Sequence, residues 1–184
     1  MTLDPLYLPH YTVTDYERWE GQWELIDGIP YAMAPAPNVR HQLLSGRLLR
    51  YLDESLEDCP DCLAIMEAEW RIREDTVVIP DVAVICYSPG DYLTQAPKLI
   101  CEVVSPSSHL RDEKIKFELY AQEGVLWYVL VYPDLPLAKI YRLQNGHYRK
   151  VRDIGQQRFA FDLNGCQAEC DFGKVFGISP AAAR

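Results

Sequence analysis

The sequence lacks the features of a membrane protein and of a secreted protein. None of its 184 residues belongs to an apolar run of about 18 residues, the length that crosses a bilayer as a helix. The first residues, MTLDPLYLPHYTVTDY, lack the basic segment followed by an apolar block that marks a secretory signal. We therefore expect no membrane partner and a cytoplasmic location.

The chain also has little positive charge. Its 18 Lys and Arg residues are outnumbered by 27 Asp and Glu, which gives a formal net charge of -9. This balance argues against a strongly basic nucleic-acid-binding surface, although carboxylates gathered around a divalent cation would add to the negative count. There is no linker, internal repeat or low-complexity segment, and 48% of the residues are hydrophobic. We expect one folded domain over residues 1–184.

Six cysteines raise the question of a metal site or disulfides. Cys86 and Cys101 lie in apolar strand-like runs and are expected to be small core residues. The other four form two loose pairs: Cys59 with Cys62, and Cys166 with Cys170. Two pairs could hold zinc through four thiolates, but they stand about a hundred residues apart in the chain. We expect free thiols, with a zinc site as the alternative.

Hydrophobic periodicity predicts a mixture of helices and strands. Apolar residues at helical spacing, capping residues and turn dipeptides such as Asn145-Gly146 set the boundaries. Their order predicts an α+β fold in which helices flank a mixed central β-sheet. The predicted helices cover residues 14–20, 41–56 and 113–122, and the predicted strands lie within 23–35, 63–73, 77–86, 99–104, 125–132, 137–143 and 148–153.

Two acids interrupt the most apolar of these strands. Asp81 lies inside VVIPDVAVI and Glu102 inside KLICEVV. A buried carboxylate is costly unless it is paired, protonated or bound to a cation. If the two strands are neighbours, both carboxylates converge on one point and form a site for a hard cation such as Mg²⁺.

The helix that follows Glu102 supplies an inward lysine. At about 100° per residue, Ile115, Leu119 and Tyr120 define its apolar stripe, and Lys116 falls within that stripe. Lys114 falls on the opposite side, where Glu118 can pair with it. A lysine beside two carboxylates can orient a water molecule or stabilise charge that develops on a phosphate.

These residues resemble a known nuclease signature. Pro80-Asp81 followed by Glu102 is similar to the PD-(D/E)xK pattern, and the wider context resembles the Uma2 family of endonucleases. The matching stretches run in the family's order from about residue 12 to residue 133: Glu24-Leu-Ile-Asp-Gly28, Met33-Ala-Pro35 with His41, Pro80-Asp-Val82, Glu102-Val-Val-Ser-Pro-Ser107, Asp112 to Lys116, and Tyr120-x-x-x-Gly124-Val125.

The sequence departs from the general signature at one important position. Val104 stands where PD-(D/E)xK proteins carry a lysine. The Uma2 family places its lysine on the next helix, four residues after an Asp, and this position is Lys116. A second departure is Tyr132, where relatives often carry Asp. It lies outside the proposed triad of Asp81, Glu102 and Lys116.

The resemblance implies a restriction-endonuclease-like fold and a metal-dependent endonuclease that hydrolyses phosphodiester bonds, with DNA as its expected partner and a homodimer as a possible active form. Asp81 and Glu102 would bind Mg²⁺ or Mn²⁺, the backbone carbonyl of Val103 would add a ligand, and Lys116 would assist the attacking water. The alternative is a protein of the same fold that binds nucleic acid or a protein partner without cutting. A third interpretation, an assembly domain, predicts no divalent-metal binding.

Simpler interpretations exist for each residue taken alone. Asp81 could cap a loop, Glu102 could pair with a structural arginine such as Arg71, and Lys116 could extend along the surface to water. His41 is either a polar residue at a helix start or part of the site. Asp27 and Glu24 are acids of the first predicted hairpin, and both are expected to shape it. Glu24 has a supporting metal role as an alternative.

Overall fold

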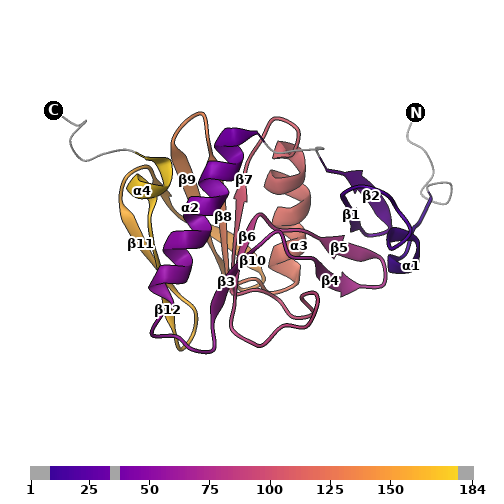
Figure 1. Ribbon diagram of the computed structural model, residues 1–184, viewed down its shortest axis with the longest axis horizontal. Helices are drawn as coiled ribbons and strands as arrows, with labels where there is room; N and C mark the ends of the chain where they lie inside the picture. Colours follow the sequence, from indigo (N-terminus) through magenta and orange to yellow (C-terminus); the bar gives the residue numbers. More distant parts are fainter. Residues whose placement is uncertain (1–8, 34–37, 178–184) are drawn as a thin grey trace. The chain divides into compact units, whose positions relative to one another are not determined.

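The computed structural model describes residues 9–33 and 38–177, which form two compact units. Each unit is assembled from separate stretches of the chain (Figure 1). The first takes the N-terminal residues up to 37 together with 68–79 and 89–95, and the second takes 38–67, 80–88 and the chain from 96 onward. The expectation of a single domain over residues 1–184 stays a prediction.

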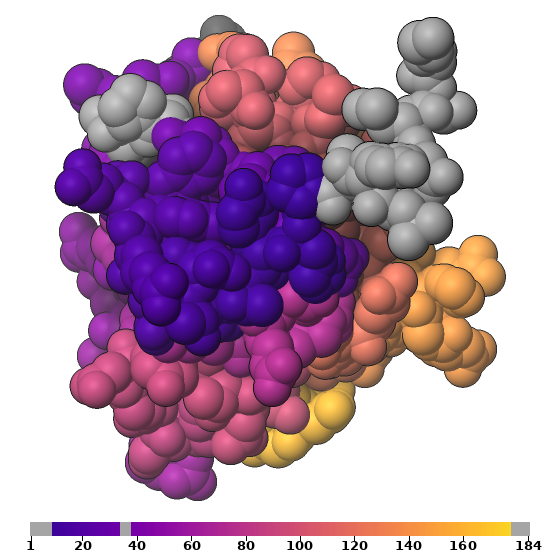
Figure 2. Space-filling model, turned by 90° about the vertical axis from the view of Figure 1, so that its right-hand side faces the viewer, coloured from indigo at the N-terminus to yellow at the C-terminus, as the bar shows by residue number. Residues whose placement is uncertain are grey.

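The first unit is a small antiparallel sheet with one short helix. Its strand order is β2-β1-β5-β4, and its residues 9–33 form a continuous indigo area on the face drawn in Figure 2. The predicted hairpin is confirmed, since Asp27 and Gly28 have φ angles of 50° and 74°, as a tight two-residue turn requires. The elements are α1 (Val13–Tyr16), β1 (Trp23–Ile26), β2 (Ile29–Ala32), β4 (Trp70–Arg73) and β5 (Thr76–Val78).

The start of α1 differs from the sequence prediction. The helix covers Val13–Tyr16 where residues 14–20 were predicted. Its N-cap is Thr12, and Asp15 closes the capping box by accepting from the backbone N–H of Thr12 at 2.9 Å. An acid three residues after the threonine satisfies the same free donors as a glutamate would. The motif residues Ala34 and Pro35 lie outside the described residues.

The second unit is built on a six-stranded mixed sheet, which confirms the predicted α+β class. Its strand order is β10-β9-β8-β7-β6-β3, with β7 and β8 parallel and the other neighbours antiparallel. The elements up to β10 are α2 (Val39–Ser55), β3 (Leu63–Met66), β6 (Val82–Ile85), β7 (Leu99–Val103), the π-helix η2 (Arg111–Ile115), α3 (Lys116–Gln122), β8 (Trp127–Tyr132), β9 (Leu137–Gln144) and β10 (His147–Ile154).

The two long strands predicted over residues 63–73 and 77–86 are each divided between the two sheets. Between β3 and β4 the chain turns at Glu67, whose φ angle is 51°. Between β5 and β6 lies Pro80, which has no N–H to donate to a strand ladder. Hydrophobic periodicity predicted one strand where the structure has two, because apolar residues continue on both sides of each break.

In Figure 1, α2 and α3 flank the sheet of the second unit, and side chains on both faces of this sheet are buried. Leucines of α2 pack with Leu99, Cys101 and Val103, the alternate residues of β7. Because strand side chains alternate, Ile100 and Glu102 lie on the opposite face, where α3 packs. The central strand that carries Glu102 is thus buried along its whole length.

The C-terminal part adds a hairpin and a helix that the sequence prediction missed. These elements are β11 (Arg158–Asp162), β12 (Gln167–Asp171) and α4 (Phe172–Phe176). Asn164 and Gly165 both have positive φ angles in the turn, as Asn145 and Gly146 do in the hairpin that was predicted. The same Asn-Gly signal therefore marked this hairpin too.

The cysteine prediction is wrong for four of the six residues. Disulfides join Cys59 to Cys166 and Cys62 to Cys86, so Cys86 is not a free core thiol. The remaining two, Cys101 and Cys170, are buried and unpaired. Within the described residues, no helix has both the length and the apolar character that crossing a bilayer would need.

Candidate active site

Asp81 and Glu102 are locked together through the backbone. The N–H of Asp81 donates to Glu102 Oε2 at 3.1 Å, and the N–H of Val103 donates to Asp81 Oδ2 at 2.7 Å. This exchange follows from the antiparallel register of β6 and β7, in which Val82 lies opposite Cys101, so that Asp81 just before β6 reaches Glu102. The two strands are neighbours, as the prediction requires, and each carboxylate lies beside the backbone of the other acid.

Glu102 is buried and held by two side-chain donors from α3. Its Oε1 accepts from Lys116 Nζ at 2.9 Å and from the Tyr120 hydroxyl at 2.9 Å. Both side chains of the ion pair are only 3% exposed. Glu102 therefore faces positive charge and hydrogen-bond donors, as a buried carboxylate requires.

Asp112 and Tyr120 belong to the same cluster, although neither was named as a site residue from the sequence. Asp112 is buried, and its Oδ1 lies 3.8 Å from Lys116 Nζ. Asp112 stands four residues before Lys116 and Tyr120 stands four residues after it. This spacing puts helical residues on one face. That spacing was the signal available in the sequence.

The predicted distinction between the two lysines agrees with their burial. Lys116 is 3% exposed, whereas Lys114 lies on the solvent side. The expected pair of Lys114 with Glu118 is not formed among the described residues, although both side chains are exposed.

His41 reaches the acidic cluster from α2. Its Nε2 lies 3.1 Å from Asp81 Oδ2, and Ser45 Oγ lies 3.5 Å from its Nδ1. Asn38 caps the helix by accepting from the backbone N–H of His41 at 2.9 Å, which fixes the first turn. Burial alone would lower the pKa of His41, but the hydrogen bond and charge of Asp81 outweigh it and raise that pKa.

The raised pKa of His41 predicts a pH-dependent contribution to stability. A histidine whose folded pKa exceeds the unfolded value of about 6.5 stabilises the fold below that pH, and the contribution disappears as pH rises through the folded pKa. In buffer with EDTA, His41→Gln should therefore cost more unfolding free energy at low pH than at high pH, as measured by urea denaturation. The exposed His147→Gln is the control, and an equal cost of His41→Gln at all pH values would contradict this prediction.

Other acids and bases of interest lie in the first unit. Glu24 is buried and accepts from the backbone N–H of Ile79 at 2.9 Å. Asp27 pairs with Arg73 at 2.7 Å beside the hairpin turn, as its shaping role predicts. Arg71, considered as a partner for Glu102, instead pairs with two acids of its own unit, Glu17 and Glu69.

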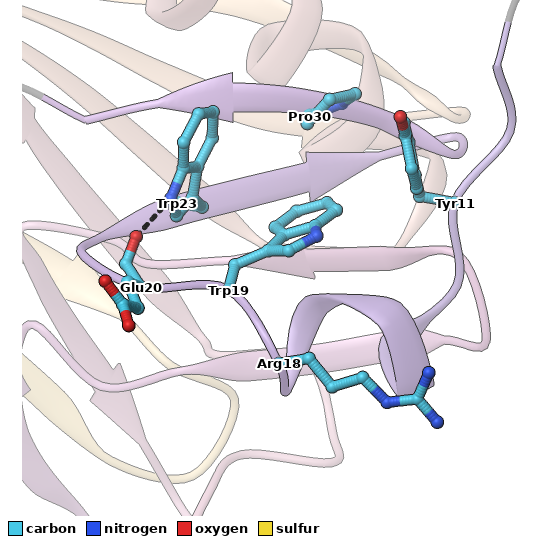
Figure 3. A pocket seen from close by; sticks show the side chains of 6 residues that line it. All are labelled: Tyr11, Arg18, Trp19, Glu20, Trp23 and Pro30. Atoms are coloured by element: carbon cyan, nitrogen blue, oxygen red, sulfur yellow. Dashed lines mark hydrogen bonds between the residues drawn. The ribbon is translucent and has the colours of Figure 1, made fainter.

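The first unit also contains an aromatic pocket of about 380 Å³ (Figure 3). Trp19 packs edge-to-face against Tyr11 at 5.4 Å and against Trp23 at 5.6 Å between ring centroids. The indole N–H of Trp23 donates to the carbonyl of Glu20, as Figure 3 shows. No residue predicted to act in the site lines this pocket, whose walls are Tyr11, Arg18, Trp19, Glu20, Trp23 and Pro30.

The two-acid set suits Mg²⁺ better than a metal that needs many protein ligands. With four cysteines joined as disulfides, no three His, Cys, Asp or Glu side chains gather as a metal-binding group within residues 9–33 and 38–177. Mg²⁺ is usually bound by one or two carboxylates and keeps several waters. Asp81 makes both of its contacts through Oδ2, which leaves Oδ1 without a hydrogen-bond donor among the described residues. The donor set therefore fits Mg²⁺.

Comparisons with known proteins point to one family. The model of the Uma2 family, described as "Putative restriction endonuclease", matches residues 13–161. No curated protein matches the chain.

Two solved structures are similar to this one. A crystal structure of a "putative nuclease belonging to DUF820" from Anabaena variabilis has a TM-score of 0.72 at 14% identity, with 91% of this chain and 98% of that chain covered. This similarity shows the fold. A DrdV–DNA complex has a TM-score of 0.32 at 14% identity over 74% of this chain and 14% of that chain, and so weak a similarity supports no conclusion.

Proposed function

The chain belongs to the Uma2 family of restriction-endonuclease-like proteins, and from that premise we propose that it is a metal-dependent endonuclease that hydrolyses phosphodiester bonds in DNA. Asp81, Glu102 and Lys116 are the proposed catalytic residues. The observation that carries the proposal is the reciprocal locking of the two acids, with Lys116 Nζ 2.9 Å from Glu102.

The two acids and the lysine have distinct tasks in this proposal. Asp81 and Glu102 would hold Mg²⁺ or Mn²⁺, and the backbone carbonyl of Val103 would be a further ligand. Such a metal polarises the phosphate and lowers the pKa of a bound water. The backbone N–H of Val103 donates to Asp81 and the hydroxyl of Tyr120 donates to Glu102, and these hydrogen bonds orient the two carboxylates.

Lys116 is proposed to act through its charge and its fixed position. Its ammonium group balances the negative charge of Glu102. The carboxylate of Asp112 lies near the same ammonium, so acids flank it on two sides. A cation fixed in a buried environment stabilises negative charge more strongly than one in water, because the surroundings screen it less. Lys116 would thus position the attacking water and stabilise the charge that develops on the phosphate.

Cleavage of plasmid DNA tests this function. Supercoiled plasmid should be nicked in the presence of Mg²⁺ or Mn²⁺ and remain intact with EDTA. Asp81→Asn should abolish nicking because it removes a charged ligand, and it should stay folded because the amide oxygen can still accept from Val103 N–H. Nicking that survives in EDTA, or full activity of folded Asp81→Asn, would contradict the proposal.

One observation favours a second function. The net charge of -9 is unusual for a protein that must approach DNA. It favours the alternative of a protein of this fold that binds nucleic acid or a protein partner without cutting, and within that alternative it favours the protein partner. The plasmid assay separates the two, since such a protein would show no metal-dependent nicking. We also propose that the active form of the endonuclease is a homodimer. Light scattering at the protein concentration of the cleavage assay tests this.

A further inference from the structure

We propose that Cys59, Cys62, Cys86 and Cys166, once reduced, form a tetrahedral zinc site in the second unit. This site is separate from the acidic cluster, and the inference does not depend on the nuclease function. The set also differs from the one that spacing alone indicated, because it contains Cys86 in place of the buried Cys170.

The fold brings these cysteines together from three segments. Cys59 and Cys62 lie in the loop between α2 and β3, where the N–H of Cys62 donates to the carbonyl of Cys59 at 2.9 Å. This turn directs two sulfurs from one short C-x-x-C segment, as structural zinc sites do. The α carbon of Cys86 lies 3.9 Å from that of Cys62, and the α carbon of Cys166 lies 6.0 Å from that of Cys59.

Regular secondary structure fixes the positions of Cys86 and Cys166, the partners of the C-x-x-C segment. Leu63 pairs with Ile85 in the β3–β6 ladder, so Cys62 and Cys86 are the next residues along the same register. Cys166 lies in the β11–β12 turn, where its carbonyl accepts from the N–H of Leu163 at 2.8 Å. The turn from Cys59 to Cys62 thus supplies one sulfur to each pair, so the two pairs are linked by a segment of four residues.

Reduction of both disulfides followed by zinc binding converts the oxidised protein into the proposed zinc form. Each disulfide is reduced by one molecule of a dithiol reductant, which becomes a disulfide itself and transfers two electrons and two protons to the cysteine pair. The four thiols then bind one Zn²⁺ as thiolates and release four protons to water. Zinc prefers this arrangement because it takes four sulfur ligands at about 2.3 Å in a tetrahedral geometry.

The remaining two cysteines provide an internal control. Cys101 is fully buried in β7, and its burial raises the pKa of its thiol well above the usual value. Cys170 is buried in β12. Neither belongs to the proposed site, so substitution of Cys101 by serine should leave zinc binding unchanged.

The test is the metal content of the whole chain after reduction with excess dithiol, addition of zinc and removal of unbound metal. The wild type and Cys101→Ser should each hold one zinc per chain by mass spectrometry, whereas Cys86→Ser and Cys166→Ser should lose it. Cobalt in place of zinc should give the absorption of a tetrahedral thiolate complex, with a charge-transfer intensity that corresponds to four thiolates. This second readout uses the wild type alone and does not depend on the folding of a variant.

Each of the following results would overturn the proposal. The first is a reduced wild type with all six thiols titratable and no bound zinc. The second is a protein that keeps two disulfides under the same reduction, with only Cys101 and Cys170 reacting after denaturation. The third is a cobalt spectrum without thiolate charge transfer, or a folded Cys86→Ser that binds zinc as the wild type does.

Discussion

Lys116→Ala is expected to lower the rate of metal-dependent DNA cleavage by about 10²-fold or more, because loss of one preorganised electrostatic group typically has an effect of this size. The side chain is 3% exposed, and its ammonium lies 2.9 Å from Glu102. Its removal deletes the only proposed catalytic cation and leaves Glu102 with the Tyr120 hydroxyl on Oε1. The measurement is the initial rate of plasmid nicking at saturating Mg²⁺.

Lys114→Ala is the matched control, since Lys114 precedes Lys116 by two residues and is exposed. It removes the same charge from the same segment, so a general effect of net charge on DNA binding would appear in both variants. We expect its activity to stay close to that of the wild type. Equal losses in the two variants, or a larger loss in Lys114→Ala, would mean that Lys116 is not the lysine of the site.

Glu102→Leu is expected to destabilise the fold by about 3 kcal/mol or more, because breaking a buried ion pair leaves the other charge uncompensated. The distance from Lys116 Nζ to Asp112 Oδ1, 3.8 Å, is longer than the 2.9 Å contact with Glu102 that the substitution removes. The exposed Glu118→Leu removes a carboxylate from α3 without this cost. The free energy of unfolding from urea denaturation, in buffer with EDTA, provides the measurement.

A double variant distinguishes the loss of the ion pair from a poor fit of leucine. Glu102→Leu combined with Lys116→Met removes both charges and should recover most of the lost stability, since apolar replacement of a whole buried pair is often neutral or better. If the double variant is as unstable as Glu102→Leu alone, the uncompensated lysine is not the cause. Cleavage should be absent in both variants.

The two acids and the lysine were predictable because each breaks a local pattern. Asp81 and Glu102 stand out as charges within apolar runs, and Lys116 as a charge within the apolar stripe of a helix. The antiparallel pairing of β6 and β7 then brings the acids together. The contact of His41 with Asp81 was not decidable from sequence, because it depends on how α2 docks on the sheet.

The cysteine pairs and the split strands show what local patterns do not contain. Cys59 and Cys166 are 107 residues apart, and no spacing rule selects Cys166 over Cys170 as a partner. The strand breaks near Glu67 and Pro80 also depend on where the chain changes from one sheet to the other. The β11–β12 turn, in contrast, carried an Asn-Gly signal and was predictable.

The assembly of α2 has a consequence for synthesis on the ribosome. Its apolar face, with Leu44, Leu48 and Leu52, packs in one cluster with residues as late in the chain as Val175. At about 5–20 residues per second, the roughly 120 residues from Ser55 to Val175 take about 6–24 s to emerge. During that interval the leucines of α2 lack part of their final cover, so the nascent chain exposes apolar surface that favours aggregation.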